Sequence, residues 1–306
     1  MASKIKFTNL DKIYYPDIGV AKGQVIDYYR SIAKFILPYL KDRPVTLKRY
    51  PEGIEGPEIY QRHLKESIDV PFLKTQKIYV SDKAGVRDFI MCQNISSLIY
   101  LTQLGTIEYH PWYSIIDDSG GTLPAKFTTN DALQKSVLNY PNLLVFDLDP
   151  PAKKFSEDMI ETALAAKKLL DKLKLISYVK TSGKSGLHIY LPLKRLYTYE
   201  RVRRFACGIG EQLIKNKVKI TLETRISKRG NLTFFDCSQN ALSKSLVSAY
   251  SLRAAPRAAV SFPVAWANLR TVRPGDYTIK NVPALLKRYG DPWQNLLTGP
   301  KNSILP

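Results

Sequence analysis

The segment "NLLVFDLDPP", residues 142–151, places the tightest limit on the fold. An apolar run that ends in acids and is stopped by Pro150 and Pro151 predicts a buried strand. Alternate residues of a strand point to the same side, so Asp147 and Asp149 project together. Such carboxylates repel each other unless a cation lies between them, and oxygen ligands favour Mg²⁺ or Mn²⁺. The alternative is a pair of solvated acids at a strand end.

The elements that follow predict an α+β sheet. Strand 142–149 leads into a helix at 156–175, then into the strands "ISYVKTS" and "LHIYLPL", a helix at 198–216 and a further strand, "NLTFFDCS". This order resembles the split β-α-β arrangement of ferredoxin-like cores. Further expected elements are helices at 21–40, 93–105 and 281–290 and the strands "VTLKRYP", "EIYQRH", "TIEYHPWYS", "KITLETR" and "AYSLRA".

The turn in "KTSGKSGLHIYLPL", residues 180–193, ends like a phosphate-binding P-loop but does not fit one. A P-loop needs an earlier glycine where this chain has Tyr178, and a helix where this chain has a predicted strand. The turn still offers a phosphate its backbone N–H groups and the side chains of Ser182, Lys184 and Ser185. His188, six residues after Ser182, is either an ordinary core histidine or a further group facing the same anion.

A third carboxylate, Asp236, ends the apolar strand in "LTFFDCSQN" and precedes Gln239. On its own it is equally well an ordinary strand-end acid. Three strand-end carboxylates, split two and one, are what a two-metal nucleotidyl-transfer site needs. The rival haloacid-dehalogenase phosphatase motif continues with Gly-Thr, where this chain has Pro150 and Pro151.

The net charge of +19 in 306 residues predicts a polyanionic partner, which is nucleic acid in preference to an anionic membrane surface. The alternative is a basic surface with no such partner. Residues 237–275 contain no acid, so we expect them to form a cationic wall. Within them "AYSLRA" presents Arg253, with Ser251 on the same face, for phosphate contact.

The three cysteines, Cys92, Cys207 and Cys237, are widely spaced and include no C-x-x-C. This spacing argues against a zinc site or a disulfide framework and for a reducing interior. The chain has no apolar leader and no apolar run of membrane-spanning length, so we expect a soluble, intracellular protein.

Taken in order, seven segments resemble a known family: "RPVTLKRYPEGIEGP", "YQRH", "LGTIEYHPW", "LLVFDLDP", "VKTSGKSGLHIYLPL", "FFDCSQNA" and "AYSLRA". They resemble the archaeo-eukaryotic primase superfamily and, within it, the polymerase domain of ligase D from prokaryotic non-homologous end joining. The resemblance spans about residues 5–295. It implies a primase-polymerase fold, with a ferredoxin/RRM-like catalytic sheet and an N-terminal α/β portion packed against it. We expect one catalytic domain over 1–306, with portions at about 1–140 and 141–295 and a tail at 296–306.

The resemblance also implies roles for individual residues. The expected catalytic metal ligands are Asp147, Asp149 and Asp236, which would hold Mn²⁺ or Mg²⁺, with no zinc. The expected nucleotide-binding residues are Lys48, His110, Ser182, Lys184, Ser185, His188, Gln239 and Arg253. The expected DNA-binding residues are Lys12, Lys22, Arg49, Tyr60 and Arg229, of which the first two would grip the 5′-phosphate at the far side of a gap.

Two departures from the family pattern affect these roles. Relatives read T-S-G-G-K-G or T-S-G-S-K-G, so Lys184 is displaced by one residue and Ser185 stands in the usual position of the lysine. Many relatives carry two aromatic residues for template bases, where this chain has Ile59 and Tyr60.

We therefore expect a nucleotidyltransferase that adds NTPs, or less readily dNTPs, to a primer 3′-end at gaps or synapsed double-strand breaks. It would be a stand-alone polymerase or an excised domain, with ligase and Ku as separate partners, in a prokaryotic cytoplasm at the nucleoid. Two copies could bridge two DNA ends transiently. The alternatives are a non-catalytic DNA-end-binding module and a metal-dependent phosphohydrolase.

Overall fold

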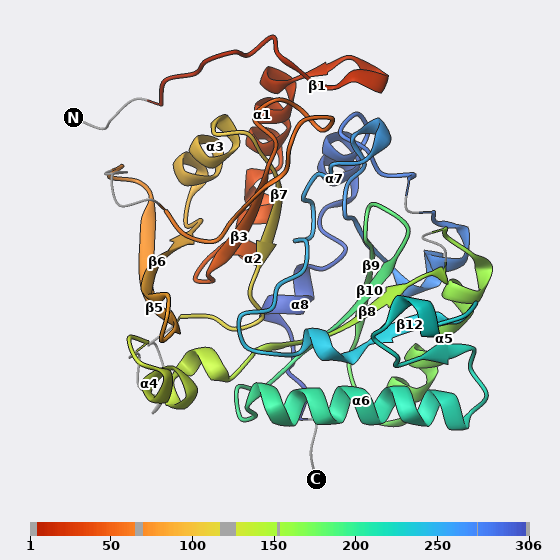
Figure 1. Cartoon of the computed structure of the whole chain (residues 1–306). Helices are drawn as coiled ribbons and strands as arrows, with labels where there is room; N and C mark the ends of the chain where they lie inside the picture. The colour runs from red at the N-terminus through yellow and green to blue at the C-terminus, as the bar shows by residue number, and fades with distance from the viewer. Residues whose placement is uncertain (1–4, 65–69, 117–126, 152–153, 274, 304–306) are drawn as a thin grey trace.

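The computed structural model describes residues 5–64, 70–116, 127–151, 154–273 and 275–303. Its largest sheet has the strand order β11-β12-β8-β10-β9-β13 and carries the predicted strand-helix-strand-strand-helix-strand unit (Figure 1). The elements of this unit and its edges are β8 Leu143–Asp149, α5 Glu157–Lys172, β9 Tyr178–Thr181, β10 Leu187–Pro192, α6 Tyr199–Lys215, β11 Ile220–Thr221, β12 Thr233–Asp236 and β13 Pro263–Val264.

The order β12-β8-β10-β9 is that of a ferredoxin-like sheet, in which the first and third strands lie at the centre. The predicted α+β class is therefore confirmed. The predicted strand "AYSLRA" is wrong: Tyr250 takes a positive φ of 67°, and Leu252 makes only an isolated bridge to Val260. Arg253 consequently stands on an irregular segment.

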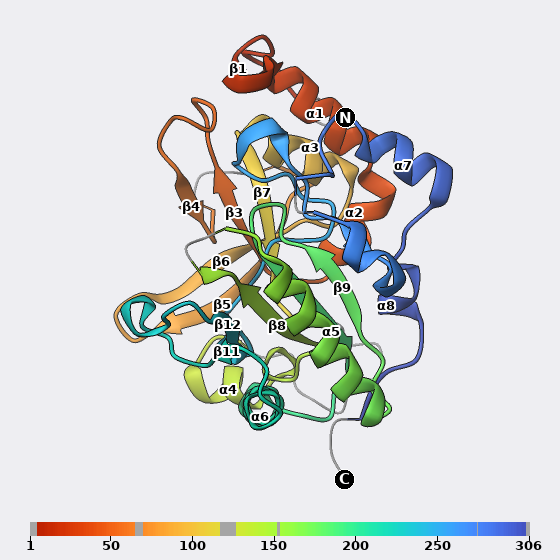
Figure 2. The same ribbon diagram turned by 90° about the vertical axis from the view of Figure 1, so that its right-hand side faces the viewer.

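Helices α5 and α6 cover one face of this sheet (Figure 2). The rings of Phe146 and Phe235 lie on that face, with centroids 4.9 Å apart. Gly210 of α6 comes so close that a Cβ there would lie 3.1 Å from the Phe235 ring. Because strand side chains alternate, Asp147 and Asp236 point to the opposite face, away from the helices.

The N-terminal portion contains a three-stranded sheet, β4-β3-β7, and the hairpin β5-β6. The expected helix at 21–40 is two helices, because Ile32 leaves the helical conformation with φ −102° and ψ 8°. The elements are β1 Ile13–Tyr15, β2 Val20–Ala21, α1 Lys22–Ser31, α2 Ala33–Leu40, β3 Val45–Arg49, β4 Ile59–Gln61, β5 Lys74–Ser81, β6 Gly85–Met91, α3 Ile95–Gln103, β7 Thr106–Pro111 and α4 Asn130–Lys135.

The main hydrophobic core is continuous between the N-terminal portion and the sheet of β8. The hydroxyl of Tyr28 in α1 donates to the Tyr250 carbonyl at 2.8 Å. At the other end of the chain, helices α7 Val282–Tyr289 and α8 Gln294–Thr298 flank Trp293, whose indole N–H donates to the Val179 carbonyl at 3.0 Å. No helix within the described ranges is both long and apolar enough to cross a membrane.

A disulfide joins Cys207 of α6 to Cys237, with 5.1 Å between their Cα atoms. The cysteine spacing, which argued against a disulfide framework, therefore did not predict this bond. The two cysteines are 30 residues apart in sequence, and they meet because α6 packs against the segment that follows β12. Cys92 is free and buried.

Candidate active site

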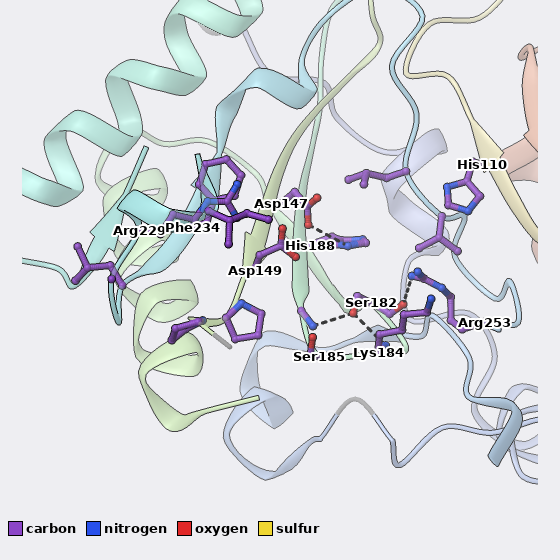
Figure 3. A pocket seen from close by; sticks show the side chains of 18 residues that line it. His110, Asp147, Asp149, Ser182, Lys184, Ser185, His188, Arg229, Phe234 and Arg253 are labelled. Atoms are coloured by element: carbon purple, nitrogen blue, oxygen red, sulfur yellow. Dashed lines mark hydrogen bonds and ion pairs between the residues drawn. The ribbon is translucent and has the colours of Figure 1, made fainter. Parts of the chain in front are cut away.

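Four polar side chains form a row across neighbouring strands of the large sheet. In the strand register Asp236 of β12 pairs with Asp147 of β8, Asp147 pairs with His188 of β10, and His188 pairs with Lys180 of β9. Directly paired residues share a face of the sheet, so the row lies on the face opposite the helices. Figure 3 shows Asp147, Asp149 and His188 close together at this position.

Close polar contacts join three members of the row, Asp147, His188 and Lys180. His188 Nε2 lies 3.2 Å from Asp147 Oδ1, and Lys180 Nζ lies 2.7 Å from His188 Nδ1 and 2.5 Å from Ser261 Oγ. When Lys180 is charged it can only donate, so His188 Nδ1 accepts and Nε2 carries the proton toward Asp147. Burial, followed by repulsion from Arg253, holds the pKa of Lys180 well below its ordinary value.

Two of the expected metal ligands, Asp147 and Asp149, carry raised pKa values. Burial and then repulsion from Asp236 raise the pKa of Asp147 to about 7. Burial and then repulsion from Asp147 raise the pKa of Asp149 to about 7 as well. Carboxylates that are costly to ionise side by side are the donor set that a divalent cation stabilises.

The side chains of Asp147, Asp149 and Asp236 are not arranged around a common metal position in this structure. In the described part of the chain, no three His, Cys, Asp or Glu side chains are grouped closely enough to hold a metal ion as they stand. Asp236 Oδ1 is occupied, since it accepts from the Ser238 N–H at 2.8 Å and from the Ser238 hydroxyl at 2.5 Å. The donor chemistry therefore fits Mg²⁺ or Mn²⁺, but binding requires these side chains to turn.

A cavity of about 690 Å³ opens over Asp147 and His188, while Asp236 and Lys180, the two ends of the row, do not line it. It is large enough for a nucleotide and is bordered by both acids and cations. Of the predicted site residues, the ones that line it are His110, Asp147, Asp149, Ser182, Lys184, Ser185, His188, Arg229 and Arg253.

The turn between β9 and β10 is held by Ser182. Its hydroxyl oxygen accepts from the backbone N–H groups of Lys184, at 3.1 Å, and Gly186, at 2.9 Å. Gly183 takes a φ of +74°, and a Cβ there would lie 2.7 Å from Cγ of Arg253. The turn is thus built around glycine, and it brings Lys184 to the cavity beside Arg253.

The sequence interpretation did not identify Glu108, which anchors the cationic side of the cavity. Glu108 is fully buried on β7 and lies 2.9 Å from His110 Nε2, 3.1 Å from Arg253 Nε and 3.7 Å from Lys184 Nζ. One signal was present in the sequence. Glu108 and His110 are two residues apart in a predicted strand and so share a face.

Three residues on strands β3 and β4 were expected to bind nucleotide or DNA, and their side chains differ in environment. Lys48 Nζ is paired with Glu58 at 3.0 Å. Arg49 points inward, with Nε and Nη2 donating to the Leu104 carbonyl at 2.9 and 2.7 Å. Tyr60 is half exposed, so its ring is accessible for stacking.

Lys12 and Lys22 lie together at the start of α1, and neither lines the cavity. The Lys22 backbone N–H donates to the Lys12 carbonyl at 2.8 Å. The Lys22 side chain is 6% exposed and donates to the Thr8 carbonyl at 2.9 Å, and Lys12 pairs with Glu52 at 2.7 Å. Burial and then repulsion from Lys12 lower the pKa of Lys22, so an anion bound here would relieve the repulsion.

The segment after β12 differs from expectation in two respects. Gln239 is half-buried and does not line the cavity. Of the cations in the predicted wall, Arg253 lines the cavity, whereas Arg270 and Arg273 form ion pairs with Glu161 and Glu157 on α5.

Ser251 also differs from expectation, because it is fully buried and is not presented to phosphate together with Arg253. Its hydroxyl accepts from the Tyr109 N–H at 3.0 Å. Arg229, which was expected to contact DNA, lines the cavity, with its guanidinium 3.5 Å from the centre of the Phe234 ring.

Comparisons with known proteins agree with this arrangement. The chain is 29% identical to the multifunctional non-homologous end joining DNA repair protein LigD of Mycobacterium tuberculosis (strain H37Rv), over 87% of this chain and 33% of that protein. It is 28% identical to the bifunctional non-homologous end joining protein LigD of Bacillus subtilis (strain 168), over 99% of this chain and 46% of that protein. The chain thus spans a third to a half of the length of these relatives.

A solved structure, the polymerase domain from Mycobacterium tuberculosis ligase D in complex with DNA, superposes with a TM-score of 0.83 at 27% identity. The match covers 96% of this chain and 98% of that domain. Residues 21–293 match the family described as LigD, primase-polymerase domain. The chain belongs to this family of primase-polymerase domains from non-homologous end joining proteins.

Proposed function

We propose that this chain is a DNA-dependent nucleotidyltransferase that extends a primer 3′-end at gaps or synapsed double-strand breaks, with a preference for ribonucleotides. The observation that carries the proposal is the pairing of Asp236 with Asp147 on adjacent strands, with Asp149 beside them on the wall of a nucleotide-sized cavity. Family membership supports the same activity.

The metal ligands would be Asp147, Asp149 and Asp236. Two Mg²⁺ or Mn²⁺ ions, when bound, would supply the charge that activates the primer hydroxyl and neutralises the leaving pyrophosphate. The chain's own contribution is to hold Asp147 and Asp236 in register on adjacent strands, with His188 Nε2 at 3.2 Å from Asp147 Oδ1. Raised pKa values near 7 favour metal binding as the pH rises, because protons compete for the same oxygens.

Cations on the opposite wall would bind the triphosphate. Lys184 and Arg253 line the cavity, and the side chain of Arg253 is fixed at 2.6 Å from the Ser182 carbonyl through Nη1. Ser182, Ser185 and His188 line the same cavity, and Lys48 lies beyond it on β3. Gln239 would have to turn toward the cavity to take part.

The pair Lys12 and Lys22 would bind the 5′-phosphate on the far side of a gap. The Lys22 ammonium donates to the Thr8 carbonyl and lies 2.9 Å from the side-chain amide of Gln103, so neither of these partners neutralises its charge, and it gains a favourable partner when phosphate arrives. Tyr60 would stack on a template base, and Arg229 would contact the DNA end. Arg49 is the weakest candidate for DNA contact, because its donors are taken by the Leu104 carbonyl.

We extend the proposal to the cellular setting. The LigD relatives join DNA ends, which supports a role in double-strand break repair beside a ligase and Ku in a prokaryotic cytoplasm. Transient bridging of two DNA ends by two copies is part of the same proposal.

Primer extension on a one-nucleotide gap tests the proposal. Reactions contain NTPs or dNTPs with Mn²⁺ or Mg²⁺, and the downstream strand carries or lacks a 5′-phosphate. We expect NTP-favouring insertion that the phosphate stimulates and that Asp149→Ala abolishes. Lys22→Ala should reduce the phosphate stimulation about tenfold or more, because a charge-assisted hydrogen bond is lost. Lys172→Ala, at the exposed end of α5, is the matched control.

Other outcomes separate the alternatives. DNA binding without incorporation of any nucleotide would leave an end-binding module. Release of phosphate from nucleotides in the absence of DNA would favour a phosphohydrolase. Extension that ignores the downstream phosphate would assign a general primase-polymerase and remove the role of Lys12 and Lys22.

A further inference from the structure

Glu108 is a buried carboxylate directly behind the cationic wall of the cavity. Its side chain has no exposed surface, so a bound nucleotide cannot touch it. Its Oε1 accepts from the Ala254 N–H at 2.9 Å and lies 3.1 Å from Arg253 Nε, and its Oε2 lies 2.9 Å from His110 Nε2. The two oxygens therefore have different neighbours, with backbone and guanidinium on one side and imidazole on the other.

The charge of Glu108 determines the hydrogen bonding of His110. Burial alone would raise the pKa of Glu108, but Arg253, His110 and Lys184 together hold it well below its ordinary value. An ionised carboxylate has no proton to donate, so the nitrogen of His110 that faces it must carry one. Burial lowers the pKa of His110, which favours the neutral ring. The remaining nitrogen, Nδ1, is then a hydrogen-bond acceptor.

This acceptor belongs to a residue that lines the cavity, and no described residue hydrogen-bonds to it. Phosphate oxygens also accept hydrogen bonds, so they are poor partners for Nδ1 of His110. A sugar hydroxyl can donate to it. Arg253 and Lys184, in contrast, can only donate, and they suit phosphate.

We propose that Glu108 is a positioning residue that divides the cationic wall of the cavity into two regions. Arg253 and Lys184 form a hydrogen-bond donor region for phosphate, and His110 forms an acceptor region for a sugar hydroxyl. The inference rests on the proposed function, because it names the parts of the nucleotide that the same cavity binds. It also narrows the role expected for His110, from nucleotide binding in general to contact with the sugar.

The substitution Glu108→Gln should reverse the hydrogen bond to His110. The amide oxygen is required by the Ala254 N–H and by Arg253, so the amide NH₂ group has to face His110 Nε2. That nitrogen then accepts, and Nδ1 carries the proton and becomes a donor toward the cavity. The shape of the site changes little, but His110 no longer offers an acceptor to the sugar hydroxyl of a bound nucleotide.

Binding measured by titration calorimetry without DNA, in the presence of Mg²⁺, tests the proposal. The probes are UTP, dUTP, 2′,3′-dideoxy-UTP and inorganic tripolyphosphate. Wild-type protein should bind UTP about fivefold more tightly than the dideoxy analogue, which is the value of one neutral hydrogen bond. Glu108→Gln should remove this difference. It should bind tripolyphosphate as tightly as wild type or more tightly, because a negative charge behind Arg253 and Lys184 is gone.

A second measurement reports the hydrogen bond itself. The chain has three histidines, so ¹⁵N spectra of its ring nitrogens are simple to assign. We expect His110 to carry its proton on Nε2 in wild type and on Nδ1 in Glu108→Gln. Glu58→Gln is the matched control: it removes a carboxylate 3.0 Å from Lys48, and no hydrogen bond joins Glu58 to His110. It should leave the His110 proton in place.

The outcomes are decisive in both directions. Equal weakening of UTP and tripolyphosphate by Glu108→Gln would assign Glu108 a structural role only and overturn the proposal. So would an unchanged position of the His110 proton. If Glu108→Gln does not fold, His110→Phe provides the same test, since it should remove the UTP preference and leave tripolyphosphate binding intact. Primer extension by wild type is scored separately, so failure of the proposed function and failure of this inference are distinguishable.

Discussion

Asp147→Asn should stabilise the metal-free protein at pH 8, although it removes an expected metal ligand. The Asp147 residue is 7% exposed, and burial together with Asp236 raises its pKa from 3.8 to about 7. Ionisation of this side chain therefore costs more free energy in the folded protein than in the unfolded chain. An amide of the same shape carries no such charge.

The size of the effect follows from the pKa shift. A shift of about three pKa units corresponds to about 4 kcal/mol, which is a ceiling because Asp147 titrates together with Asp149. At roughly 2 °C per kcal/mol for a chain of this size, the midpoint of thermal unfolding would rise by at most about 8 °C. The folded-state pKa lies above the unfolded value, so the penalty is absent below about pH 4 and fully present above about pH 7.

Thermal unfolding followed by circular dichroism in EDTA, from pH 5 to pH 8, measures this effect. The difference in unfolding midpoint between Asp147→Asn and wild type should be small at pH 5 and largest at pH 8. Glu211→Gln, which removes an exposed carboxylate on α6, should show no comparable trend. Mn²⁺ should then raise the midpoint of wild type more than that of Asp147→Asn. A gap that does not change with pH, or a variant less stable than wild type at pH 8, would refute the reasoning.

Three further substitutions test the surroundings of the row. Gly183→Ala should destabilise the fold by about 1–3 kcal/mol in urea unfolding and weaken nucleotide binding, because φ is +74° and the new Cβ would displace Arg253. Cys207→Ser should lower stability by about 2–4 kcal/mol and make unfolding insensitive to reductant, unlike wild type. Lys180→Met should leave circular dichroism unchanged and slow primer extension, because His188 loses its hydrogen-bond partner at Nδ1; equal rates would contradict this role.

Local sequence patterns are sufficient to predict most of the catalytic sheet. The apolar runs before Asp147 and in "LHIYLPL" each identify a strand that is buried on both faces. The glycine-rich turn between β9 and β10 is likewise predictable, because Gly183 marks a left-handed position. These features depend only on residues close together in the sequence, so they can be predicted without the structure.

Contacts between segments far apart in the sequence cannot be predicted from local patterns. Glu108 and Arg253 are 145 residues apart and meet only when the N-terminal sheet packs beside the catalytic sheet. Cys207 and Cys237 meet because a helix lies on the segment after a strand. Lys180 reads as an ordinary strand residue until the register of β9 with β10 places it beside His188. These three contacts were not predicted for the same reason: a single sequence does not show which elements pack side by side in the fold.

Register is therefore the property on which the candidate site depends most. If β12 slipped by one residue along β8, Asp236 would turn to the helix-covered face and the row would be broken. A buried side chain opposes that slip. Beyond Asp236 the chain leaves the sheet, but the amide of Asn240 donates to the Val145 carbonyl at 2.7 Å and accepts from the Val145 N–H at 2.9 Å. These two bonds extend the ladder past the strand end, so the buried amide of Asn240 helps to hold Asp236 in register with Asp147.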